Sequence, residues 1–103
     1  VRRKERNIAM KNEKPFEKFT DGMNLMLISK ENLQKRLIIA YENHIFRVDP
    51  NELPKEKRDQ YIEIQKQLSS IKSENELDEN KAQEIADDLF QIYLAVINDF
   101  YSP

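Results

Sequence analysis

The sequence predicts an all-α protein, a small antiparallel bundle of three to four helices with short connections. Apolar residues recur at spacings of three and four along most of the 103 residues, which is the helical period. The single glycine argues against a β-rich fold, whose turns usually need several. Charged residues make up 35% of the chain and hydrophobic residues 39%, with a mean hydropathy of −0.81. That mixture is typical of one core under a heavily charged surface.

The chain divides into two parts by composition. Residues 1–14 carry six basic and two acidic side chains, a net charge of +4, and are predicted to form a basic polar N-terminal tail or a helical extension. Met10 is an alternative start of the natural protein, in which case residues 1–9 would not belong to it. Residues 15–103 have the length of a single domain and are predicted to form the bundle.

The first two helices are predicted over about 15–28 and from Ser29 onward. Pro15 suits a first helical turn, and Gly22 weakens the first helix enough that a kink or break is expected near it. Ser29 is the predicted N-cap of the second helix, and Asp49-Pro50 redirects the chain after it. The buried stripe of the first helix is expected to contain Phe16, Phe19, Met23, Met26 and Leu27. That of the second helix is expected to contain Leu33, Leu37, Ala40, Tyr41, His44 and Ile45.

The segment 49–54 is predicted to be a turn with a short helical turn inside it. Asp49 would cap that turn, and Val48 and Leu53 would hold it against the core. A third helix is predicted over about 54–71, followed by a polar loop and by a fourth helix from an Asp78 N-cap to about Phe100.

The fourth helix carries an unusually wide apolar arc. At about 100° per residue its apolar side chains cover roughly 200°, twice the width typical of a surface helix. Two interpretations remain open: the helix is covered on two sides by its own chain, or its far edge also serves a partner. The candidate contact residues at this edge are Phe90, Leu94 and Tyr101.

A second candidate contact surface lies on the second helix. Ile39 and Phe46 are one heptad apart, on a side otherwise occupied by polar residues. An exposed apolar pair can mark a contact patch, whereas the first helix could equally fold over both residues.

Catalytic and metal-binding chemistry has little support in the sequence. His44 is the only histidine and the chain has no cysteine, so His44 is expected to be a partly buried residue at a helix end. The carboxylates of residues 74–88 match no ion-binding spacing and are expected to form a solvated acidic face. We therefore expect no enzymatic activity, no metal, no cofactor and no small-molecule substrate.

A nucleic-acid partner is the main alternative to a protein partner. Arg2, Arg3, Lys4 and Arg6 could neutralise phosphates. The whole chain, however, has a net charge of −2 and a pI near 5.5, unlike a typical DNA-binding domain.

Two segments of the chain carry three motifs: an Arg-Leu-x-x-Ala-Tyr helix, a Leu-Pro-x-Glu-x-Arg-Asp turn and an Asp-Glu-x-x-Ala-x-x-Ala helix. The residues of these motifs are Arg36, Leu37, Ala40 and Tyr41, then Leu53, Pro54, Glu56, Arg58 and Asp59, then Asp78, Glu79, Ala82 and Ala86. Over about two thirds of its length, the chain resembles in these motifs a group of small, functionally uncharacterised, all-helical bacterial proteins. The resemblance implies a helical bundle and no particular activity.

Taken together, these features favour a small cytoplasmic, non-catalytic protein that acts through protein–protein contacts. It would be self-associating, adaptor-like or an inhibitory subunit. No apolar run approaches the roughly 18 residues of a membrane span, so no membrane partner is expected.

Overall fold

The computed structural model describes residues 13–101, and in this part of the chain every regular element is helical. Four α-helices pack against one another, which confirms the predicted all-α fold. They are α2 (Glu13–Ile28), α3 (Leu33–Asn43), α4 (Arg58–Ser69) and α5 (Glu79–Phe100). Four short 3₁₀ turns connect them: η1 (Ile45–Arg47), η2 (Pro50–Glu52), η3 (Lys55–Lys57) and η4 (Glu74–Glu76).

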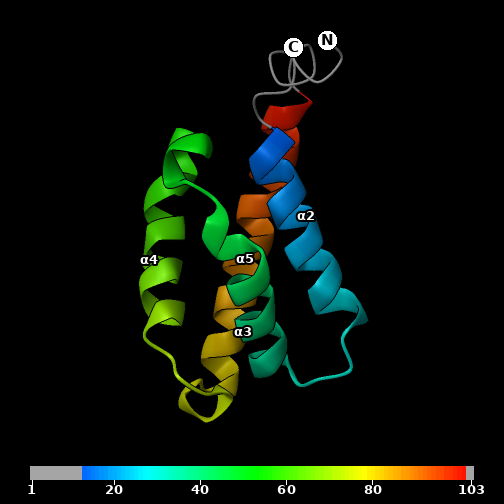
Figure 1. Ribbon diagram of the computed structural model, residues 1–103. Helices are drawn as coiled ribbons and strands as arrows, with labels where there is room; N and C mark the ends of the chain where they lie inside the picture. The colour runs from blue at the N-terminus through cyan, green and yellow to red at the C-terminus, as the bar shows by residue number, and fades with distance from the viewer. Residues whose placement is uncertain (1–12, 102–103) are drawn as a thin grey trace.

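The longest helix, α5, is the centre of the arrangement. Figure 1 shows it behind α3, with α2 on one side and α4 on the other, and α2, α3 and α4 all contact it. The start of α2 lies beside the end of α5, where the rings of Phe16 and Phe100 stack with centroids 4.4 Å apart. The two helices therefore run antiparallel.

The core is formed by apolar side chains from all four helices and from the turns between α3 and α4. Within the described residues no polar or charged residue is buried. Val48 and Leu53 are 1% and 2% exposed, which confirms that the turn is held against the core. On α5 the buried residues are Ala82, Ile85, Leu89, Ile92 and Val96.

The turn after α3 is capped as the sequence predicts. The Asp49 side chain accepts a hydrogen bond from the Asn51 amide at 3.0 Å, and Glu52 Oε1 accepts one from the Asp49 amide at 3.4 Å. This capping box satisfies backbone groups that a short 3₁₀ turn leaves without partners.

Two predicted helix starts are wrong. Asn32, not Ser29, is the N-cap of α3, and its Oδ1 accepts from the Lys35 amide at 2.9 Å. Ser29 instead accepts from the Glu31 amide in the preceding turn. The third helix begins as the 3₁₀ turn η3 and becomes α-helical only at Arg58. The segment predicted as a loop before α5 contains η4.

Gly22 does not break the first helix, because α2 is continuous through it. A Cβ atom at this position would lie 2.7 Å from Cγ1 and 2.9 Å from Cδ1 of Ile45. Ile45 is fully buried, so its side chain has little room to move away. Glycine is therefore needed here for the close approach of α2 to η1.

Tyr61 ties α4 to the turn that follows α3. Its side chain is fully buried, and its hydroxyl donates to the carbonyl oxygens of Ile45 at 2.6 Å and Val48 at 2.9 Å. Gln65 donates to the same hydroxyl at 3.3 Å. Burial raises the pKa of Tyr61 well above its ordinary value near 10, and the neighbouring Tyr41 raises it further.

We predict that Gly22→Ala lowers the free energy of unfolding, although alanine is the better helix former. Overpacking against Ile45 costs about 1–3 kcal/mol, while the gain in helix propensity is about 1 kcal/mol. Chemical denaturation of Gly22→Ala, of Ile45→Ala and of the variant with both changes measures both effects. In an Ile45→Ala background, where the clashing atoms are absent, Gly22→Ala should instead stabilise the protein; destabilisation in both backgrounds would contradict this account.

We predict that Tyr61→Phe lowers the free energy of unfolding by about 1–3 kcal/mol, because the Ile45 and Val48 carbonyls lose their buried donor. The Tyr61 pKa is higher in the folded state than in the unfolded state. Its stabilising contribution is therefore complete below about pH 10 and is lost as the pH rises above it. Denaturation from pH 7 to 11 should show the difference between wild type and Tyr61→Phe narrowing only above pH 10. A constant difference would contradict the raised pKa.

Candidate protein interface

One side of α5 remains apolar and exposed after the core has formed. Phe90 and Leu94, four residues apart, are 45% and 44% exposed, and Tyr101 at the C-cap is 71% exposed. Half-buried Ile97 lies between them on the same side of the helix. We name this set the outer strip: Phe90, Leu94, Ile97 and Tyr101. It extends roughly 16 Å along α5, at a rise of about 1.5 Å per residue.

The described fold does not use Phe90 or Leu94 for its core. Neither belongs to the buried cluster, nor to the half-buried apolar residues packed against it. On the adjoining side of α5, by contrast, Tyr93 is held by α2: its hydroxyl lies 3.0 Å from Thr20 Oγ1, and its ring stacks on Phe19 with centroids 6.4 Å apart. Tyr93 is therefore held by α2, whereas Phe90 and Leu94 lie further round the helix.

Tyr101 is anchored although most of it is exposed. Its ring meets those of Phe16 and Phe100 edge-on, with centroids 6.1 and 4.9 Å away. Such aromatic contacts limit the positions of an exposed ring. The C-terminal end of the strip is thus a preformed aromatic surface.

The second candidate pair, Ile39 and Phe46, does not share a helix face. The helix α3 ends at Asn43, and Phe46 lies in η1, where the backbone no longer has the α-helical period. Phe46 is 45% exposed but packs against the Tyr41 ring, and the Arg47 guanidinium lies 5.6 Å from its centroid. Ile39 is half-buried. The heptad argument for this patch therefore fails at the end of α3.

Three exposed apolar residues were missed by the sequence patterns. Leu27 and Ile28, in the last turn of α2, are 79% and 75% exposed, and Ile62 on α4 is 36% exposed. The prediction that Leu27 belongs to the buried stripe is wrong, because Leu27 lies about 100° round α2 from the buried Met26. Leu27 and Ile28 lie in the last turn of α2 before a polar connection, and this position in the sequence could have indicated their exposure.

His44 is the half-buried C-cap residue of α3, and its amide donates to the Ala40 carbonyl at 3.1 Å. Its predicted place at a helix end is confirmed. The described residues contain no group of three histidine, cysteine, aspartate or glutamate side chains placed to hold a metal ion.

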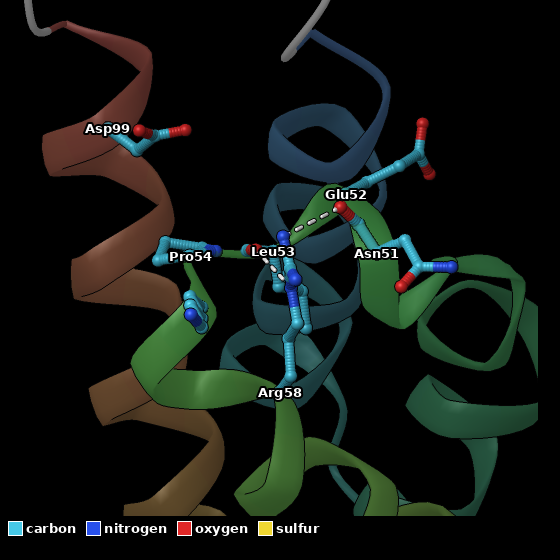
Figure 2. A pocket seen from close by; sticks show the side chains of 7 residues that line it. Asn51, Glu52, Leu53, Pro54, Arg58 and Asp99 are labelled. Carbon is cyan, nitrogen blue, oxygen red and sulfur yellow. Dashed lines mark hydrogen bonds between the residues drawn. The ribbon is translucent and has the colours of Figure 1, made fainter.

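A hollow of about 430 Å³ lies between the turn before α4 and the end of α5 (Figure 2). Arg58 crosses it, donating through Nε to the Leu53 carbonyl at 3.1 Å and through Nη2 to the Asn51 carbonyl at 3.2 Å. Asp99 lies on the opposite wall, on α5. Because Glu52 belongs to the capping box and Arg58 binds the backbone, these side chains shape the turn.

The motifs behind the bacterial resemblance also have structural roles. Arg36 donates through Nη1 to the Met26 carbonyl at 2.9 Å and so joins α3 to the end of α2. The Tyr41 hydroxyl lies 2.9 Å from Ser69 Oγ, joining α3 to α4. Together with Arg58, these residues fix the packing of the helices rather than a site.

The basic residues proposed for nucleic-acid contact, Arg2, Arg3, Lys4 and Arg6, lie outside the described residues. That role stays a prediction. None of the helices in the described part of the chain is both long and apolar enough to cross a membrane.

Comparison of this chain with protein-family models, curated proteins and solved structures found no match. The resemblance to uncharacterised bacterial proteins therefore stays a prediction.

We predict that Arg58→Met lowers the free energy of unfolding by roughly 1.5–3 kcal/mol, the range for hydrogen bonds to a charged group. Methionine retains most of the aliphatic stem but cannot donate to the Leu53 and Asn51 carbonyls. Urea denaturation measures the loss. Exposed Lys55→Met in the same hollow is the control and should change stability by less than about 0.5 kcal/mol. Equal effects of the two changes would contradict the structural role of Arg58.

Proposed function

We propose that this protein is a non-catalytic interaction protein whose contact surface is the outer strip of α5. The observation that supports the proposal most directly is the exposure of Phe90 and Leu94 on adjacent turns, outside a core that is complete without them. Single exposed apolar residues are common on protein surfaces, but a contiguous row is characteristic of an interaction site.

The composition of the strip also supports protein binding. Aromatic residues are enriched at protein interfaces, and the strip supplies Phe90 and Tyr101 at its two ends. Tyr101 is already oriented by its ring contacts, so less conformational entropy is lost when a partner covers it.

The chemistry of the rest of the described chain fits the same proposal. The hollow beside Arg58 is lined by side chains that hold a turn, and His44 caps a helix. Neither place pairs a nucleophile with a base in the way that covalent catalysis requires.

Site-specific photo-crosslinking in the native cells tests the proposal. A photoreactive phenylalanine analogue at position 90 replaces one half-exposed aromatic ring with another. The matched control carries the analogue at position 62, where Ile62 is an exposed apolar residue on α4. We expect a discrete protein adduct from position 90 and none from position 62.

Absence of an adduct at position 90, or equal adducts at both positions, would contradict the proposal. Mass spectrometry of the adduct identifies the partner as another polypeptide or as a second copy of this chain.

A further inference from the structure

We infer that the outer strip is covered by a second copy of this chain, with the two α5 helices packed antiparallel across a two-fold axis between Leu94 and Ile97. This inference rests on the proposed function and specifies its partner. In this arrangement Phe90 of one copy packs on Tyr101 of the other, and Leu94 packs on Ile97, so that every member of the strip is covered by another member.

The borders of the strip favour self-association over a charged partner. The side chains that flank it on α5 are largely the uncharged amides Gln83, Gln91 and Asn98. No lysine or arginine of α5 lies on this side, because the only basic residue of the helix, Lys81, lies more than 120° from the strip and within 3.7 Å of Glu84. A strongly acidic or basic partner would find no row of opposite charges here, whereas a second apolar strip with amide borders is complementary.

Charge also selects the antiparallel orientation. Asp87, one turn before Phe90, is the charged residue of α5 closest to the strip. In a parallel pair the two Asp87 carboxylates would face each other. About an axis between Leu94 and Ile97 they lie roughly 25 Å apart along the helices, well beyond the Debye length of about 8 Å at physiological ionic strength.

The size of the strip determines the strength to expect. A fully buried aromatic ring covers roughly 200 Å², so the exposed fractions of Phe90 and Tyr101 correspond to roughly 230 Å² per copy. With Leu94 and Ile97, two copies would bury roughly 600 Å² of apolar surface, or about 1,000 Å² in total at the apolar fraction of ordinary interfaces. That is the lower limit for a specific contact, so we expect reversible dimers with a dissociation constant in the micromolar range or weaker.

Sedimentation equilibrium of the purified full chain, from about 10 µM to 1 mM, tests the inference. The average mass of the wild type should rise from the 12.3 kDa of one chain toward twice that value. Leu94→Glu should weaken the association at least about tenfold with unchanged helicity, and Ile62→Glu on α4 should leave it unchanged. A wild type that stays at 12.3 kDa, a Leu94→Glu dimer, or equal effects of both variants would overturn the inference.

Mixing two variants tests the register and does not depend on Leu94→Glu remaining folded. Phe90→Glu and Tyr101→Lys should each dimerise poorly alone and associate when mixed, because the proposed register brings Glu at 90 against Lys at 101. No gain on mixing would overturn the register.

The outcomes separate this inference from the proposed function. A monomeric wild type together with a position-90 adduct to another polypeptide would refute the second copy and support the interaction protein. A monomer without any adduct at position 90 would refute both.

Discussion

The packing of the bundle depends on the buried contact of Gly22, Ile45 and Tyr61. The Tyr61 hydroxyl holds the carbonyls of Ile45 and Val48, and this fixes the 3₁₀ turn that follows α3. The fixed turn presents the Ile45 side chain to α2, where only a residue without Cβ leaves room for it. Phe19, one turn before Gly22, contacts the Tyr61 ring with centroids 6.0 Å apart. Three helices are thus positioned by one cluster, and a change in any member is transmitted to the others.

The apolar arc of α5 is wider than the part of it that faces the core. Ile85, Leu89, Ile92 and Val96 face the core, and Tyr93 on one flank is held by α2. Phe90 and Leu94 lie one step further round the helix and belong neither to the buried cluster nor to the apolar residues packed against it. Their exposure on adjacent turns is the observation that supports the proposed interface.

The helices could be predicted from the sequence because each one combines a strong apolar period with recognisable ends. The Asp49 capping box and the burial of Val48 and Leu53 follow directly from local residue chemistry. The start of α3 was misplaced because Ser29 and Asn32 are both good caps, and nothing local decides between them. The role of Gly22 could not be predicted, since it depends on Ile45, a residue 23 positions away that only the tertiary fold brings near.

The candidate interface was likewise predictable from the sequence only in part. The far edge of the α5 arc could be predicted, because a long regular helix makes angular positions reliable. The shared helix face expected for Ile39 and Phe46 does not form because α3 ends at Asn43, which the apolar period alone did not reveal. Leu27 was misplaced because it lies four residues after Met23, a spacing that fits the apolar period, although it lies about 100° round the helix from the buried Met26.

The stacked rings of Phe16 and Phe100 join opposite ends of the described chain. This contact closes most of the described chain into a single loop, and among the ring contacts only that of Phe16 with Tyr101 spans one residue more. Loop closure of this length carries an entropic cost that local helix contacts do not, so the contact is expected to form late in folding. Neither end can then fray alone: when α5 unwinds from its C-terminus, the first turns of α2 lose their cover, and the same holds in reverse. The start of α2 and the end of α5 are therefore expected to open as one cooperative unit, whereas the ends of a folded chain most often open independently.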